Sequence, residues 1–177
     1  MVAFASGGSI FGKMKMGARV APFVSGKGTI MKVYLSGEIH TDWRSEVEAA
    51  CEGLDVTFTA PVTDHGASDD CGAAILGAEP DKFWHDHKGA KLNSIRTRNA
   101  IEAADVVVVR FGEKYRQWNA AFDAGYAAAL GKSLIVMHGP DHQHALKEVD
   151  AAALAVTETP RQVADILRYV LTGRLPG

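Results

Sequence analysis

Asp123 is the residue whose type and surroundings most favour catalysis. It is the one acid in Trp118-Asn-Ala-Ala-Phe-Asp-Ala-Gly-Tyr-Ala-Ala-Ala129, a run that predicts an apolar helix over 119–130. A carboxylate among small side chains can attack an electrophilic carbon or stabilise a developing cation. The structural alternative is an acid near the positive end of the helix dipole. The apolar setting favours the catalytic interpretation.

Three more candidates lie in Tyr34-Leu-Ser-Gly-Glu-Ile-His40, where the first predicted strand ends. Glu38 could orient a sugar hydroxyl or act as a general acid, and the alternative is an exposed loop acid. Tyr34 could position a sugar or simply pack at the strand end. His40 could hydrogen-bond a ligand.

The remaining candidates follow the other predicted strands or lie on the helix before the central strand. Arg96 and Arg98 could hold an anionic group or form a solvated helix face. Trp118 and Trp84 could form an aromatic wall for a base or sugar, or belong to the core or to a subunit contact. The predicted substrate-binding residues are Tyr34, Ser36, Gly37, His40, Arg96, Arg98, Phe111, Gly112, Trp118 and Asn119.

The histidines do not predict a metal site. His85 and His87 flank Asp86, but side chains two residues apart on a helix point in different directions. The three histidines within 138–144 are too loosely spaced for a ligand set, and that loop could simply be solvated. We therefore predict no metal, and attack by a carboxylate needs no organic cofactor.

Strands and helices alternate along the chain from residue 31. The valines at 106–109 are typical of a strand covered on both faces of a parallel sheet. This alternation predicts an α/β fold, a flavodoxin-like doubly wound parallel five-stranded sheet in a single domain over 31–173. Strands are predicted at 31–36, 55–59, 104–109, 133–137 and 154–156. Helices are predicted near 42–51, 81–103 with a break at Gly89, 119–130, 144–149 and 161–171, and a long loop at 62–80.

Composition excludes several function classes. The formal net charge of the 177 residues is −2, so the composition does not predict the basic surface that binds nucleic acid. No stretch approaches the roughly 20 apolar residues that span a bilayer, so we expect no membrane partner. The two cysteines have no C-x-x-C spacing, which favours reduced thiols and a cytoplasmic location. Residues 1–30, with four basic residues and no acid, are predicted to be a flexible basic N-terminal extension.

Three sequence pieces resemble the YtoQ family, grouped with the nucleoside 2-deoxyribosyltransferases. They are Tyr-Leu-Ser-Gly-Glu-Ile-His at 34–40, Phe-Trp-His-Asp-His-Lys-Gly-Ala-Lys at 83–91, and the run at 118–129. The resemblance covers about 31–171. It implies a tyrosine at the end of the first strand, matched by Tyr34, and an acidic nucleophile before Gly-Tyr-Ala, matched by Asp123. Glutamate is usual at the nucleophile position, so this carboxylate is one methylene shorter.

The resemblance implies a nucleoside or nucleotide substrate, and an enzyme that transfers or hydrolyses its N-glycosidic bond. Two positions depart from the superfamily pattern, because Thr97 stands where an aspartate protonates the leaving base and Gln117 where a further carboxylate lies. Both departures also favour the alternative of a non-catalytic nucleotide-binding or sensing module. The alanine-rich face of 120–129 permits close helix packing, and we expect a homo-oligomer.

Overall fold

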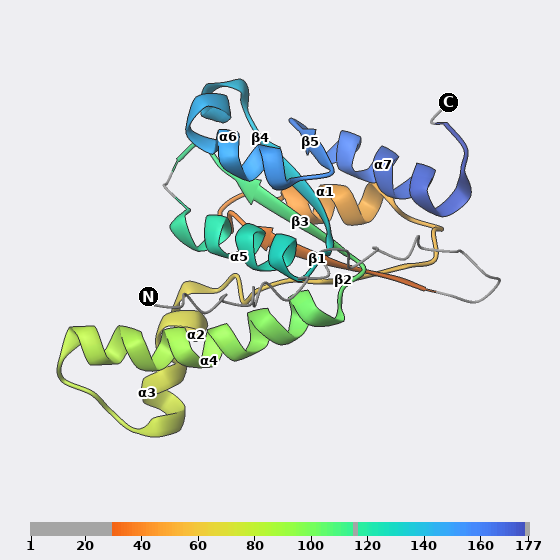
Figure 1. Ribbon diagram of the computed structural model, residues 1–177. Coiled ribbons are helices and arrows are strands. Elements are labelled where there is room, and N and C mark those ends of the chain that lie inside the picture. Colours follow the sequence, from red (N-terminus) through yellow and green to blue (C-terminus); the bar gives the residue numbers. More distant parts are fainter. Residues whose placement is uncertain (1–29, 115–116, 176–177) are drawn as a thin grey trace, which may run out of the picture.

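The sheet has five parallel strands in the order β2-β1-β3-β4-β5, as Figure 1 shows for the computed structural model. The structure describes residues 30–114 and 117–175, so the predicted extension at 1–30 lies almost entirely outside the described residues. The strands are β1 (Met31–Gly37), β2 (Val56–Thr59), β3 (Val106–Phe111), β4 (Ser133–His138) and β5 (Ala155–Thr157). The predicted doubly wound α/β fold is confirmed.

Burial of the strands follows their sequence pattern. β3 is the central strand, and its four valines are buried because helices cover both faces of the sheet. β2, at one edge, alternates half-buried and exposed residues. Asp105 precedes β3 at the amino edge, as predicted, where its carboxylate accepts a hydrogen bond from the Lys32 backbone N–H at 2.8 Å.

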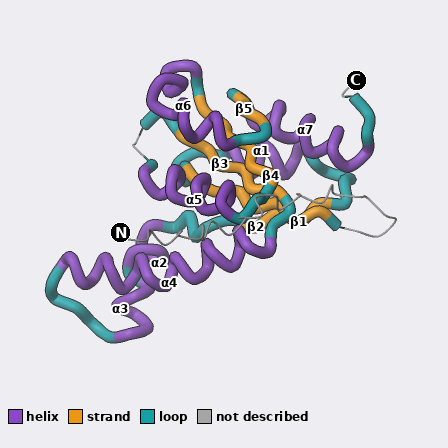
Figure 2. The backbone as a smooth tube through the Cα atoms, viewed as in Figure 1, coloured by secondary structure: helices purple, strands orange, loops and turns teal. Residues whose placement is uncertain are grey.

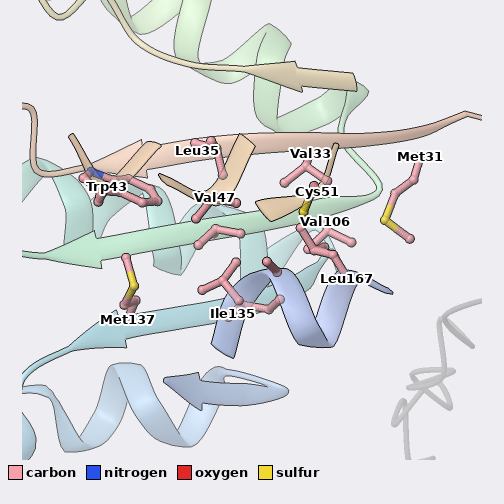
Figure 3. Packing of buried hydrophobic residues seen from close by; sticks show 13 residues of the cluster. Met31, Val33, Leu35, Trp43, Val47, Cys51, Val106, Ile135, Met137 and Leu167 are labelled. Atoms are coloured by element: carbon pink, nitrogen blue, oxygen red, sulfur yellow. The ribbon is translucent and has the colours of Figure 1, made fainter. Parts of the chain in front are cut away.

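Two groups of helices cover the two faces of the sheet. α1 (Trp43–Ala50) and α7 (Pro160–Thr172) pack on one face, where Trp43, Val47 and Leu167 lie against Leu35 and Ile135 of the strands (Figure 3). α4 (Lys82–Ala103), α5 (Trp118–Ala129) and α6 (Gln143–Ala152) pack on the other face, around Ile101, Ala124 and Leu146. A 3-10 turn (Pro140–His142) precedes α6.

The prediction of a long loop at 62–80 is wrong, because this segment contains α2 (His65–Asp69) and α3 (Cys71–Leu76). The Asp64 carboxylate caps α2 by accepting a hydrogen bond from the Ala67 N–H at 2.7 Å. Both helices are too short to show an apolar period, and they are stabilised by packing on α4 (Figure 2).

The predicted break at Gly89 is also wrong, since α4 continues through it. Gly89 allows close helix packing instead, because a Cβ atom there would lie 2.8 Å from the Asp69 carbonyl oxygen. Gly72 of α3 faces the Gly89 backbone, which leaves no room for a side chain at 72 either. The glycines therefore fix α2 and α3 against the first half of α4.

Candidate active site

The carboxyl ends of β1 and β3 lie side by side in the sheet, although their sequences are far apart. Ser36 pairs with Val109 and Gly37 with Arg110. The chain leaves β1 and β3 toward opposite faces of the sheet, through α1 and α5. Such a switch point leaves a crevice at the carboxyl edge, where ligands bind in open α/β sheets.

Asp123 reaches this edge from α5. The Ser36 hydroxyl donates a hydrogen bond to Asp123 Oδ2 at 2.5 Å, and Ser36 itself is buried. Among the described residues, Asp123 Oδ1 has no hydrogen-bond partner. Burial raises the pKa of the Asp123 carboxyl above its ordinary value, and the Ser36 hydrogen bond partly opposes this rise. One carboxylate oxygen is thus held, while the other is available.

Tyr34 and Thr97 lie on the α4 side of Asp123. The Tyr34 hydroxyl donates a hydrogen bond to Thr97 Oγ1 at 3.4 Å, and Tyr34 is only 1% exposed. Burial raises the pKa of the Tyr34 phenol, the Thr97 hydrogen bond lowers it, and the Asp123 charge raises it. The Tyr34 hydroxyl therefore lies within electrostatic reach of the Asp123 carboxylate.

Glu38 lies in the turn after β1 and is turned inward. It is 5% exposed, so the alternative of an exposed loop acid is wrong. Its carboxylate accepts hydrogen bonds from the His40 backbone N–H and from the Thr41 hydroxyl, the latter at 2.5 Å, and lies 3.7 Å from Arg110 Nε. Direct contact of Glu38 with a substrate stays a prediction, whereas these contacts order the turn.

Glycines make this turn possible. Gly37 has a φ of +98° and lies so close to the Arg110 carbonyl that a Cβ atom would overlap it. Gly112, at the end of β3, packs directly on the side chain of Glu38. The backbones of the two strand ends can therefore approach each other at the switch point.

Arg44 is a residue of this site that sequence reasoning missed. Its guanidinium is buried and donates hydrogen bonds to the carbonyl oxygens of Leu35 (3.0 Å), Gly37 (3.0 Å) and Glu38 (2.7 Å). Burial lowers the pKa of Arg44 to about 10, and the nearby Glu38 charge opposes this effect. Arg44 and Val47 share one helix face, so an arginine within a buried stripe was the available signal.

The other predicted basic residues differ in their surroundings. Arg96 is exposed on α4, and its charge lowers the pKa of the Tyr34 phenol, which places it near the site. The Arg98 guanidinium instead lies 5.9 Å from the centre of the Tyr126 ring, against α5. The His40 ring stacks on His65 of α2 at 5.1 Å. Arg96 thus lies within electrostatic reach of Tyr34, whereas Arg98 lies against α5.

The start of α5 completes the surroundings. Trp118 is 72% exposed and Trp84 is 53% exposed, so neither belongs to the core of this chain. Asn119 is exposed beside Trp118, and Phe111 is buried at the end of β3. Gln117 Oε1 accepts a hydrogen bond from the Gly112 N–H at 3.0 Å, whereas its Nε2 is buried without a partner among the described residues.

A separate cavity of about 610 Å³ lies at the carboxyl ends of β4 and β5, between α6 and α7. Its wall includes His138, which is buried rather than solvated, and whose Nε2 lies 3.1 Å from Asp150 Oδ1. Within 30–114 and 117–175, no group of three or more acidic, histidine or cysteine residues could hold a metal ion. In the same ranges, no helix is long and apolar enough to cross a membrane.

Comparison with known proteins gives a match over most of the chain. The family model described as nucleoside 2-deoxyribosyltransferase YtoQ matches residues 34–171. A relative from Bacillus subtilis (strain 168), described as uncharacterized protein YtoQ, is 41% identical over 140 residues. That alignment covers 78% of this chain and 95% of the relative.

Two solved structures are similar to this chain. One is a conserved protein from Enterococcus faecalis V583, with a TM-score of 0.53 at 12% identity over 79% of this chain and 98% of that chain. The other is a 2-deoxyribosyltransferase from Bacillus psychrosaccharolyticus, with a TM-score of 0.49 at 17% identity over 76% and 90%. The similarity to the Enterococcus protein is one of fold.

Proposed function

Because this chain belongs to the nucleoside 2-deoxyribosyltransferase YtoQ family, we propose that it cleaves the N-glycosidic bond of a nucleoside-like or nucleotide-like small molecule. The observation that carries this proposal is the Asp123 carboxylate, held by Ser36 through one oxygen at the switch point of the sheet. Asp123 is the proposed nucleophile. Its available oxygen attacks the anomeric carbon, and the base departs.

The resulting glycosyl ester on Asp123 is resolved by water in a hydrolase or by a second base in a transferase. The sugar resembles an oxocarbenium ion in both transition states, so an anionic carboxylate also stabilises it electrostatically. Only the ionised form of Asp123 can do this. Because burial raises the pKa of this carboxyl, activity should rise with pH through a value above that of an ordinary aspartate.

The surrounding residues have distinct proposed roles. Ser36 orients the nucleophile, and Tyr34 lies beside the sugar. Glu38 orders the turn after β1 through its contacts with Thr41 and Arg110, so it acts as a positioning residue. Arg96 is available for an anionic substituent of the substrate. Trp118 and Asn119 form the rim at the start of α5, and Ser36, Gly37, Phe111 and Gly112 form the floor.

A non-catalytic nucleotide-binding module is the second candidate. It is favoured by Thr97 and Gln117, which supply a hydroxyl and an amide where the superfamily pattern has carboxylates. A module of this kind gains thermal stability from its ligand and releases no free base.

The distinguishing experiment is a chromatographic assay for free base with a panel of nucleosides, 2′-deoxynucleosides and their monophosphates. The wild type is compared with Asp123→Asn and with the matched control Asp55→Asn, an exposed acid that precedes β2 at the opposite edge of the sheet. Base release by the wild type and Asp55→Asn, but not by Asp123→Asn, supports the enzyme. A ligand-induced thermal shift without base release from any compound supports the binding module.

The exposed face of α5 supports a homo-oligomer as part of this proposal. Trp118 is 72% and Phe122 is 62% exposed, one helical turn apart, and the single charge of α5 points inward to Ser36. An exposed patch of large apolar side chains marks an interaction surface, and a second copy of this chain is the proposed partner. Sedimentation of the wild type against Phe122→Glu tests it.

The free thiols of Cys51 and Cys71 support the proposed cytoplasmic location.

A further inference from the structure

Asp123 is a half-buried carboxylate without a cationic partner among residues 30–114 and 117–175. Its hydrogen bond comes from the neutral Ser36 hydroxyl, and no ion pair joins it to any residue within the described ranges. Charge neutralisation is the usual condition for a carboxylate away from water, because desolvation penalises the charged form. A ligand that brings a positive charge would therefore bind favourably beside Asp123.

A second feature of the site concerns the groups that could donate a proton to the leaving base. The charges that act on the Tyr34 hydroxyl are those of Asp123, Arg44 and Arg96. A guanidinium does not release its proton near neutral pH. The two guanidiniums whose charges act on the Tyr34 hydroxyl are therefore not proton donors, and the His40 imidazole after β1 stacks on His65.

The side chains nearest the position of the missing acid are weak acids. The Tyr34 hydroxyl donates its hydrogen bond to Thr97, and burial raises the pKa of its phenol, which makes it a poorer proton donor. An aliphatic hydroxyl such as that of Thr97 and an amide such as that of Gln117 are weaker acids still. These groups can donate hydrogen bonds, but they do not transfer a proton to a departing base.

The carboxyls that follow the ends of β1 and β3, Glu38 and Glu113, have other partners. Glu113 Oε2 lies 3.7 Å from His142 Nδ1. The Glu38 oxygens accept from the Thr41 hydroxyl and the His40 N–H and face Arg110, and Gly112 lies over the Glu38 side chain. Because of these contacts, we assign the two carboxyls to ordering the strand ends and not to protonation of the leaving base.

From these observations we infer that the substrate of this site is an N-glycoside whose base is already cationic before cleavage, such as a pyridinium or N7-alkylpurinium glycoside. This inference rests on the proposed function and names its substrate class. A neutral base departs as an anion unless an acid protonates it, whereas a cationic base departs neutral. The positive charge of the substrate also supplies the partner that Asp123 lacks.

The reaction balances without a proton donor. The bond from Asp123 to the anomeric carbon forms as the bond to the base nitrogen breaks, and its electron pair neutralises the cationic ring. Water then attacks the anomeric carbon, and the ester bond breaks with its electrons returning to Asp123. The proton released by water passes to solvent, so the products are free sugar, neutral base and one proton.

The test compares N7-methylguanosine with guanosine, in ribose and 2′-deoxyribose forms, since the two bases differ by one methyl group and one charge. We expect kcat/KM for the cationic member to exceed that of guanosine by about 100-fold or more, because a positioned general acid contributes roughly 10²–10⁴-fold. The positive charge of nicotinamide riboside does not change with pH. Its kcat/KM should therefore rise with pH through the pKa of Asp123 and then stay level.

Variants at position 97 make the test specific. Thr97→Asp supplies an acid at the Tyr34 hydroxyl and should raise guanosine cleavage, with a new decline of kcat/KM at high pH. Thr97→Asn, of similar size but without an acid, should show neither change. Equal kcat/KM for N7-methylguanosine and guanosine, with both activities lost in Asp123→Asn, would overturn the inference and leave the proposed function standing. No Asp123-dependent release from either member would overturn both.

Discussion

At the carboxyl ends of β1 and β3, Asp123 meets the neutral hydroxyl of Ser36, whereas at the carboxyl end of β4, Asp150 meets the imidazole of the buried His138. Both carboxylates lie at the same edge of one sheet. The Asp150 carboxylate lies beside an imidazole, whereas no basic residue of the described part of the chain forms an ion pair with Asp123, and burial raises the pKa of Asp123. Unpaired charge at a functional site is costly to the fold and useful for chemistry. The carboxylate that we propose as the nucleophile thus differs from Asp150 in having only a neutral hydrogen-bond partner among the described residues.

Asp123→Asn should produce the largest effect. Removal of the nucleophile should lower kcat for base release by at least about 10³-fold. The thermal unfolding midpoint should stay level or rise, because the amide replaces a desolvated carboxyl. Base release and thermal denaturation of the same preparation measure both quantities. A loss of activity that is accompanied by a lower unfolding midpoint would instead mean that Asp123 has a structural role.

Asp150→Asn should give the opposite pattern. Loss of the charged partner of buried His138 should lower the free energy of unfolding by about 1–3 kcal/mol, measured by urea denaturation. Base release under folding conditions should remain near that of the wild type. If activity were lost while stability stayed unchanged, the cavity between α6 and α7 would become the better candidate for the active site.

Ser36→Ala should have a smaller effect on catalysis. The Asp123 carboxylate would lose the hydrogen bond that orients it, and kcat should fall by about 10-fold. Because that hydrogen bond lowers the pKa of Asp123, its removal should move the rising limb of the pH–rate profile to higher pH. Ser36→Thr, which keeps the hydroxyl, should leave the rising limb of the pH–rate profile where it is in the wild type. If the rising limb does not shift in Ser36→Ala, Ser36 does not lower the pKa of Asp123.

The pH dependence of stability should show the smallest effect. Burial raises the pKa of Asp123 in the folded state, so the folded protein binds this proton more tightly than the unfolded chain does. The stabilisation is therefore complete below the unfolded pKa, about 4, and is lost as pH rises through the folded pKa. The unfolding free energy of the wild type minus that of Asp123→Asn should therefore become more negative as pH rises over that window. A value that becomes more positive with pH would rule out burial as the cause.

Sequence patterns predicted the sheet well, because strands such as β1, β3 and β4 are buried on both faces and read as apolar runs. They failed at 62–80, where two short helices owe their stability to packing on α4 rather than to a period of their own. Gly89 illustrates the same limit. A glycine in a helix weakens local propensity, but at this position it permits close contact with α2 and α3.

At the candidate site, some residues were predictable from the sequence, whereas the roles of others depend on contacts between distant elements. Asp123 and Tyr34 stood out by position, and the structure places both at the switch point. The inward orientation of Glu38 depends on contacts with Thr41 and Arg110 that come from different elements, so its burial was not predictable from spacing. Arg44 was missed because a buried arginine is rare and its partners are backbone carbonyls, which leave no side-chain pattern.

Covalent capture of the glycosyl intermediate shows whether Asp123 forms the bond to the sugar. Wild-type protein would be quenched in acid during turnover of N7-methylguanosine or of any nucleoside that the panel identifies, then digested and analysed by peptide mass spectrometry. We expect a glycosyl mass added to the peptide that contains Asp123, and no such addition in Asp123→Asn. A glycosyl mass on another residue, or full base release by Asp123→Asn, would rule out Asp123 as the nucleophile.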